Sequence, residues 1–231
     1  MGRIVDEAAD ANGHEIAARV DFGYAAGEGL RMLNEYQGPA DVVIDFSNHA
    51  ATVQVTEYCV KRGFPVVIAT TGQTKEEQAM IEEAAKAVPV FLSANMSLGV
   101  ALLADLAKKA AAVFPDADIE IVEKHHNQKL DVPSGTALLL ARRIKEVRPE
   151  AEFVIGRHEN GKRTQKEIGI HSLRLGNEVG IHEIIIATGS ETVTLKHEAE
   201  NRSLFAQGAL AAAAFIAGKA PGMYDMRSII E

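Results

Sequence analysis

Residues 42–72 read VVIDFSNHAATVQVTEYCVKRGFPVVIATTG, and the architecture of the chain can be inferred outward from them. Two short apolar runs, 42–46 and 65–69, enclose a helical pattern over Thr52–Arg62 that ends at Gly63. A strand, a helix and a second strand of these lengths predict a βαβ unit, because parallel strands need a crossover connection. We therefore expect an α/β protein in which helices cover an open parallel sheet.

The same alternation continues on both sides of this unit and changes character at about residue 97. The predicted helices span residues 4–11, 52–62, 75–87, 99–113, 135–147 and 204–217. The predicted strands span residues 16–20, 42–46, 65–69, 88–92, 119–123, 153–155, 167–175, 181–187 and 192–197. Short turns with glycine or serine join the later strands, which predicts a mostly antiparallel sheet of the meander type. We expect a nucleotide-binding-like domain, an inserted α+β domain and a C-terminal return of the chain to the first domain.

Composition narrows the function classes. The chain has 231 residues, 47% of them hydrophobic, so it has enough apolar surface to fold. Its net charge of −8 makes it a poor partner for nucleic acid or anionic membranes. A single cysteine excludes an internal disulfide, and the apolar run 209–217 is too short to span a bilayer. The first residues lack the apolar core of a signal peptide. We expect a cytoplasmic enzyme or small-molecule binder.

The start of the chain bears on nucleotide binding. A dinucleotide-binding domain opens with a strand, a glycine-rich turn and a helix. Residues 1–5, MGRIV, look like the end of such a turn with Gly2 as its last glycine, so we expect the strand and most of the turn to be missing because of an overlooked upstream start codon. Asp21 has the spacing of the acidic residue that binds the ribose, although it could be an ordinary surface residue at a strand end. Phe22, not a cation, follows it, which favours NADH over NADPH.

The segment 123–136, EKHHNQKLDVPSGT, has the composition of a site for an acidic substrate. Ser134 is a suitable N-cap, and Gly135 allows a carboxylate to approach the helix start. Lys129 adds a positive charge. His125 and His126 point in opposite directions in an extended segment, so one could donate a proton while the other binds substrate. Two alternatives are a solvated polar loop before a capped helix and a metal site, although zinc requires more ligands than this segment offers.

These residues resemble a known family. Residues 123–137 carry every fixed position of E-x-H-H-x-x-K-x-D-x-P-S-G-T-A, the signature of the 4-hydroxy-tetrahydrodipicolinate (dihydrodipicolinate) reductases of the diaminopimelate–lysine pathway. The resemblance covers essentially the whole chain. It implies an NAD(P)H-dependent homotetrameric reductase of a small dicarboxylate. It also implies a Rossmann-like dinucleotide-binding domain, residues 1–96 and 202–231, and a substrate-binding and oligomerisation domain, residues 97–201.

The resemblance also implies residue roles. His125 would donate the proton, and Lys129 would be a second acid that binds a carboxylate. The substrate would be held by His126, Ser134, Gly135 and Thr136. The cofactor would be held by Gly2, Arg3, Asp21, Ala69, Thr70, Thr71, Ser93, Ala94, Asn95 and Met96, and no metal is implied. Ala69 stands where family members usually have glycine.

The incomplete glycine turn leads to two further expectations. We expect weaker cofactor binding than in a complete member. It also leaves open a cofactor-deficient protein of the same fold that acts as a binding or scaffold protein. A metal-dependent hydrolase that uses His125 and His126 is a weaker alternative.

Overall fold

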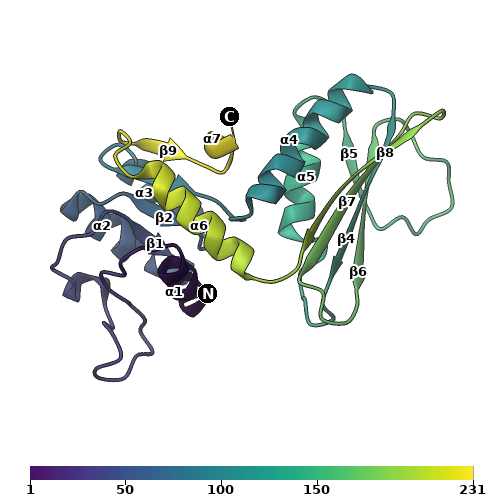
Figure 1. Ribbon diagram of the computed structural model, residues 1–231. Coiled ribbons are helices and arrows are strands. Elements are labelled where there is room, and N and C mark those ends of the chain that lie inside the picture. The colour runs from purple at the N-terminus through teal and green to yellow at the C-terminus, as the bar shows by residue number, and fades with distance from the viewer. Residues whose placement is uncertain (231) are drawn as a thin grey trace. The chain divides into compact units, whose positions relative to one another are not determined.

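The computed structural model describes residues 1–230 and divides into two compact units (Figure 1). Unit 1 comprises Met1–Ser97 and the described residues from Ser203 onward, and unit 2 is Leu98–Arg202. The predicted range 202–231 ends at Glu231, which lies outside the described residues.

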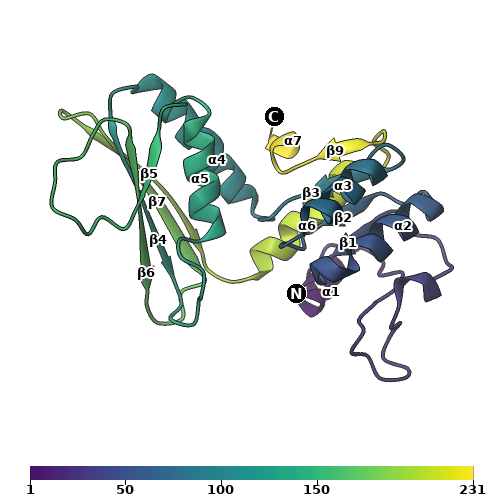
Figure 2. The same ribbon diagram turned by 180° about the vertical axis from the view of Figure 1, so that it is seen from behind.

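Unit 1 is built on a four-stranded parallel sheet in the order β1-β2-β3-β9. Its strands are β1 (Val43–Asp45), β2 (Val66–Ile68), β3 (Pro89–Leu92) and β9 (Gly222–Tyr224). Helices α1 (Gly2–Ala11) and α6 (Ser203–Ile216) cover one face, and α2 (Thr52–Arg62) and α3 (Lys75–Ala84) cover the other (Figures 1 and 2). Short helices η1 (Leu33–Glu35), η2 (His49–Ala51) and α7 (Arg227–Ile230) complete the unit. The predicted α/β class with a parallel sheet is confirmed.

Alternating side chains place the core of unit 1 on both faces of this sheet. Val66 and Ile68 on β2 pack with α2 and α3, whereas Ile44 on β1 packs with α1 and α6. The α2 helix ends where predicted, because Gly63 adopts the left-handed conformation (φ 68°) that a helix C-cap favours. These contacts hold the carboxyl ends of the strands at one edge of the sheet.

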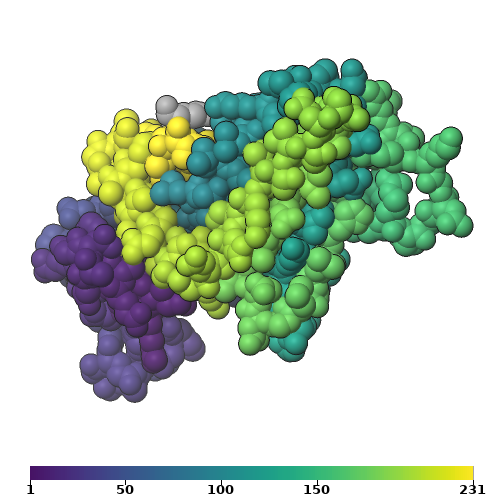
Figure 3. Space-filling model, turned by 45° about the vertical axis from the view of Figure 1, so that its right-hand side comes forward, coloured from purple at the N-terminus to yellow at the C-terminus, as the bar shows by residue number. Residues whose placement is uncertain are grey.

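The predicted strand at residues 16–20 is wrong. Among the described residues, its backbone pairing is the isolated bridge between Val20 and Leu30. Isolated extended residues form no ladder, because a strand needs a neighbour along its length to satisfy its backbone groups. Arg19 instead pairs with Asp6 of α1 at 2.7 Å. The segment after α1, up to about residue 40, stands out from the body of unit 1 (Figure 3).

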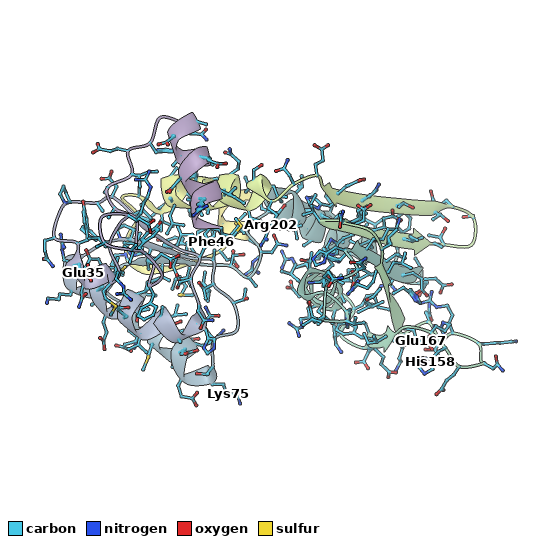
Figure 4. The ribbon with its side chains drawn as sticks, turned by 90° about the horizontal axis from the view of Figure 1, so that it is seen from below. Glu35, Phe46, Lys75, His158, Glu167 and Arg202 are labelled. Carbon is cyan, nitrogen blue, oxygen red and sulfur yellow. The ribbon has the colours of Figure 1, made fainter. Side chains whose placement is uncertain are left out.

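Unit 2 is a five-stranded mixed sheet in the order β5-β6-β4-β7-β8. Its strands are β4 (Asp118–His125), β5 (Glu152–Ile155), β6 (Glu167–Arg174), β7 (Gly180–Ala187) and β8 (Thr192–Ala199). The helices α4 (Leu98–Val113) and α5 (Gly135–Lys145) share one apolar core with its inner face. The loop between β5 and β6 extends to the end of the unit, where Figure 4 labels His158 and Glu167.

The simple meander predicted for these strands is wrong, because β4 lies between β6 and β7. The β4–β6 and β5–β6 pairs are parallel, while the β4–β7 and β7–β8 pairs are antiparallel. The crossover through α5 explains the arrangement, because it returns the chain to the same edge as the start of β4 and so permits parallel pairing. The inner face of the central strand β4 is buried, with Ile119 and Ile121 fully inside the core that it shares with the neighbouring strands β6 and β7.

Replacing Gly208 by alanine should destabilise unit 1. Inside a helix this change ordinarily stabilises by about 1 kcal/mol. Here a Cβ would overlap the carbonyl oxygen of Met96, so we expect a loss of about 2 kcal/mol or more. Tyrosine fluorescence during urea unfolding measures it, because the chain has no tryptophan and its four tyrosines lie in unit 1. Gly161→Ala, where no described atom lies within 4 Å of the new Cβ, is the control. Equal midpoints for both variants would contradict the packing argument.

Candidate active site

The inner face of β4 changes from apolar to polar along the strand. Ile119, Ile121, Glu123 and His125 alternate onto this face, and all four are buried. The strand continues to His125, so the prediction that it ends at Glu123 is wrong. The cause is tertiary: β6 pairs with β4 as far as His125, and β7 pairs with it as far as Lys124. A pair of ionisable side chains therefore ends a strand that begins in the core.

Glu123 is the centre of this polar end. It is 0% exposed and accepts a hydrogen bond of 2.8 Å from each of the two terminal nitrogens of Arg174. It also accepts a hydrogen bond from His125 Nδ1 at 2.5 Å and from the Ser134 backbone N–H at 3.1 Å. Burial raises the pKa of Glu123, but the hydrogen bonds from His125 and Arg174 outweigh it and hold that pKa well below its usual range. The carboxylate is therefore ionised.

An ionised Glu123 determines which nitrogen of His125 is available. Nδ1 must carry hydrogen to donate to the carboxylate, which leaves Nε2 for a ligand. Gly180 keeps space beside that atom, because a Cβ at position 180 would stand 3.0 Å from Nε2. His125 is 8% exposed, so its proton would be delivered from a largely desolvated site. This geometry suits a general acid.

A second buried histidine, His182, cannot serve as that acid. Its Nε2 lies 3.1 Å from Ser134 Oγ, and its ring meets the His125 ring edge-on with centroids 5.2 Å apart. Burial, and then the charge of His125, lower the pKa of His182 to about 3. His182 therefore stays neutral at ordinary pH and supports the residue that caps α5.

The sequence predicts no role for Arg174 and His182. The structure places both on the inner face and in contact with the candidate residues. The signal that could have found them is alternation: Arg174 continues the inward series of Ile168 and Ile170 on β6, and His182 that of Ile184 and Ile186 on β7. A polar residue in register with a core series is buried and needs a partner.

The start of α5 adjoins this cluster through Ser134, and the prediction that Ser134 caps the helix is confirmed. Ser134 caps the helix by accepting a hydrogen bond from the Ala137 N–H at 3.1 Å. Gly135 is exposed, and no described heavy atom lies within 4 Å of where its Cβ would stand. Thr136 follows, half-buried. The open approach to the first turn suits an anion, which the helix dipole favours.

The other predicted substrate residues lie in the loop after β4. The His126 N–H donates to the Glu178 carbonyl at 2.8 Å, and the His126 carbonyl accepts from the Lys129 N–H. The Lys129 ammonium is paired with Asp131 at 2.8 Å. Among the predicted substrate residues, Ser134 is thus directly joined to the Glu123–His125 pair, while the charge of Lys129 is held by an exposed carboxylate.

The predicted nicotinamide residues follow neighbouring strands of unit 1. Residues 69–71 come directly after β2 and residues 93–96 directly after β3, and the Ser93 N–H donates to the Ile68 carbonyl at 3.2 Å. Thr70 Oγ1 is buried and has no hydrogen-bond partner among the described residues. Ser93 Oγ donates to the Asn95 carbonyl at 2.7 Å, and Ala94 is exposed between them. The structure brings these two segments together at the carboxyl edge of the sheet, where α/β sheets bind ligands.

The predicted ribose residue has a different setting from the one expected. Asp21 is exposed and accepts a hydrogen bond from the Gly23 N–H at 2.8 Å, in a turn and not at a strand end. Arg31 donates to the Phe22 carbonyl at 3.2 Å and lies 5.2 Å from the Phe22 ring centroid. A cation from further along the chain thus contacts the residue after Asp21, and the preference for NADH stays a prediction. Gly2 and Arg3 form the exposed first turn of α1.

Residues 1–230 contain no group of three or more His, Cys, Asp or Glu side chains arranged to hold a metal ion. Within the same range, no helix is both long and apolar enough to cross a bilayer. The predicted homotetramer and cytoplasmic location stay predictions.

The chain matches a described protein family over nearly its full length. Residues 1–96 match "Dihydrodipicolinate reductase, N-terminus", and residues 99–230 match "Dihydrodipicolinate reductase, C-terminus". The chain belongs to the dihydrodipicolinate reductase family. The family predicted from the 123–137 motif is confirmed, and so is the predicted enzyme class, an oxidoreductase with a pyridine-nucleotide domain.

Individual members of the dihydrodipicolinate reductase family are similar over most of their length. A 4-hydroxy-tetrahydrodipicolinate reductase of Caldanaerobacter subterraneus subsp. tengcongensis is 50% identical over 201 residues, 86% of this chain and 80% of that protein. One from Clostridium tetani is 46% identical over 235 residues, 98% and 91% of the two chains. The solved dipicolinate-bound dihydrodipicolinate reductase from Paenisporosarcina sp. TG-14 is 27% identical with a TM-score of 0.76, covering 97% of this chain and 92% of that one.

The buried His182 predicts a loss of stability on mild acidification. Its pKa is about 3 in the folded chain against an ordinary 6.5, so between these values the unfolded chain binds a proton that the folded chain excludes. The free energy of unfolding should therefore fall as pH decreases through this window, by up to about 1.4 kcal/mol per pH unit from this residue. Hydrogen exchange of the β7 amides, corrected for intrinsic rates, measures it. His182→Gln should flatten the slope, and exposed His158→Gln should not; equal slopes would refute the assignment.

Proposed function

We propose that this chain catalyses the NAD(P)H-dependent reduction of 4-hydroxy-tetrahydrodipicolinate to tetrahydrodipicolinate, the reaction for which its relatives are named. The observation that carries the proposal is the His125 imidazole, bonded through Nδ1 to an ionised, fully buried Glu123 beside the open start of α5. A proton donor and an anion-binding helix start in one cluster are what the reduction of a dicarboxylate with an imine-type ring requires.

His125 would act on the charge that develops in the substrate ring. The 4-hydroxyl group would leave the ring as water, and a bound nicotinamide cofactor would supply the hydride to the resulting conjugated ring. Glu123 stabilises the protonated imidazole, and His125 then donates its Nε2 proton to quench the negative charge on the ring. When that proton leaves, the imidazole remains bonded to Glu123 in the same orientation. His125 is therefore ready for reprotonation without a change of tautomer.

Two features would bind the substrate carboxylates. The first turn of α5, which begins at Gly135, would face one of them with the positive end of the helix dipole. Lys129 would bind a carboxylate by exchanging its exposed partner Asp131 for the substrate. Such an exchange replaces one ion pair by another, so the ammonium is never left unpaired in the site. The dipicolinate-bound relative supports a small dicarboxylate as the ligand class.

Unit 1 offers groups that fit a pyridine nucleotide. The buried, unpartnered Thr70 Oγ1 at the end of β2 suits a polar group of the cofactor, and residues 93–96 would line the same edge. Ala69 and Thr71 would flank it, while Asp21 would accept hydrogen bonds from a ribose. Gly2 and Arg3 would meet the cofactor at the exposed start of α1.

The proposed roles of His125 and Lys129 are distinguishable by kinetics. His125→Gln should lower kcat by about 100-fold or more and leave the Kd for NADH unchanged, because a general acid acts in the transition state. Lys129→Ala should lower kcat and also weaken inhibition by pyridine-2,6-dicarboxylate. Steady-state rates with either cofactor and calorimetric titration of the dicarboxylate measure both effects.

Two surface variants serve as controls for this pair. His158→Gln and Lys75→Ala alter exposed residues and should behave like the unmodified chain (Figure 4). If the unmodified chain binds the dicarboxylate but reduces no substrate with either cofactor, the proposed activity is wrong. If the Lys129 variant binds the inhibitor as tightly as the unmodified chain, the carboxylate role of Lys129 is wrong.

We also propose that both NADH and NADPH serve as cofactors, with Arg31 binding the 2′-phosphate of NADPH. The Arg31 guanidinium contacts Phe22, the residue after Asp21, although Arg31 itself follows Asp21 by ten positions in the chain. Arg31→Ala should raise KM for NADPH by about tenfold and leave KM for NADH unchanged, since only NADPH carries the phosphate. Lys61→Ala on the surface of α2 is the control. Equal effects on both cofactors would contradict the role of Arg31.

A further inference from the structure

We propose that Arg174 is a positioning residue for the reduction: through Glu123 it orients the proton donor His125, and through the Asp131 carbonyl it holds the loop that carries Lys129. This inference rests on the proposed function. In this role, the Arg174 side chain fixes the position of the His125 imidazole relative to the loop that carries Lys129.

The geometry of the guanidinium supports this role. One terminal nitrogen donates to Glu123 Oε2 and to the Leu173 carbonyl, and the other donates to Glu123 Oε1 and to the Asp131 carbonyl, all at 2.8 Å. A planar fork that meets a carboxylate at two points fixes its orientation as well as its position. Glu123 therefore cannot rotate away from His125 Nδ1 without breaking the pair with Arg174.

The sheet places Arg174 at this position by register. Arg174 on β6 is the direct partner of His125 on β4, and the Leu175 N–H donates to the His125 carbonyl at 2.9 Å. The strand that supports the backbone of the acid thus also supplies the cation that orients its side chain. A shift of the pairing by one residue would move Arg174 to the other face of the sheet.

Charge gives Arg174 an effect that packing alone would not have. Several groups face His125: Glu123 on its own strand, Arg174 on β6, His182 on β7 with its register partner His197 on β8, and the Lys129–Asp131 pair in the loop. The first turn of α5 contributes no charged side chain. Removing the Arg174 charge favours proton binding by every remaining group, so the His125–Glu123 unit should release its proton at higher pH.

Arg174→Gln tests the proposal through three kinetic readouts. We expect kcat/KM to fall about 100-fold, weaker binding of pyridine-2,6-dicarboxylate and an unchanged Kd for NADH. The alkaline limb of the kcat/KM profile should move up by about 1 pH unit. In the double variant with His125→Gln, the loss in kcat should be smaller than the product of the two single losses, because part of the effect of Arg174 is exerted through His125. Additive losses, or an unmoved pH limb, would overturn the proposal.

Arg163→Gln is the matched control for a loss of structure. Its side chain is 20% exposed, against 18% for Arg174, and it pairs with Asp118 and Glu120, which alternate onto the opposite face of β4. Removing it costs ion pairs in the same unit and should leave the pH limb in place. Arg174→Lys keeps the positive charge but cannot form the two-point contact with the Glu123 carboxylate. It should therefore retain the alkaline limb of the kcat/KM profile at its normal pH, with a lowered kcat/KM.

A measurement that needs no turnover separates this proposal from the proposed function. In ¹⁵N-imidazole NMR, His125 of the unmodified chain should be locked with hydrogen on Nδ1, and Arg174→Gln should show both tautomers. An inactive chain with this locked signal, lost on substitution, would refute the reductase and retain the positioning role. If the chain is active but the His125 tautomer is the same in the unmodified chain and in Arg174→Gln, the positioning role alone is refuted.

Discussion

The arrangement of unit 2 depends on a carboxylate that has no access to water. Breaking a buried ion pair by removing one partner costs about 3–5 kcal/mol, so Glu123 requires donors on every side. They come from the imidazole on its own strand, the fork of Arg174 on β6 and the backbone at the start of α5. Two neighbouring elements, β4 and the start of α5, must therefore meet the more distant strand β6 at one point before the charge of Glu123 is satisfied.

The same requirement links stability to chemistry. An apolar residue at position 123 could fill the space and avoid the cost of a buried charge, but it would leave the His125 ring without an orienting partner. The apolar core below, formed by Ile119, Ile121 and the facing residues of α5, is what keeps the polar end rigid. A mostly aliphatic unit thus carries a small polar region, joined by hydrogen bonds, at one edge. The reaction proposed for this chain takes place where the core ends.

Local signals in the sequence predict local features of this fold. Helix α2 spans the expected residues, and Gly63 ends it. Ser134 caps α5 as expected, because an N-cap is recognised from the residue type and its immediate neighbours. The residues 16–20 have the composition of a strand, but composition does not supply a neighbour for pairing. Conversely, the strand expected to end at Glu123 continues to His125, because pairing with β6 and β7 extends it beyond what its own composition indicates. Strand ends are tertiary properties.

The site was predictable to the same extent. The motif identified His125 and Lys129, which share one segment of about a dozen residues. Arg174 and His182 join them only through pairing between strands, and Arg31 contacts Phe22, the residue after Asp21, only across a turn. Nothing in the immediate neighbourhood of these three residues separates them from ordinary surface side chains. Their alternation with core residues is the nearest signal, and it becomes informative only when the register is known.

The contact between Gly208 and the Met96 carbonyl has a consequence for how the chain is organised. Met96 lies next to the point where the chain leaves unit 1, and Gly208 lies in the first helix after its return. From the standpoint of unit 1, the whole of unit 2 is one long loop whose two ends are fastened together. The entropy cost of closing a loop grows only with the logarithm of its length. Unit 1 can therefore carry an insertion of very different size at nearly the same cost, provided that this one close contact is kept.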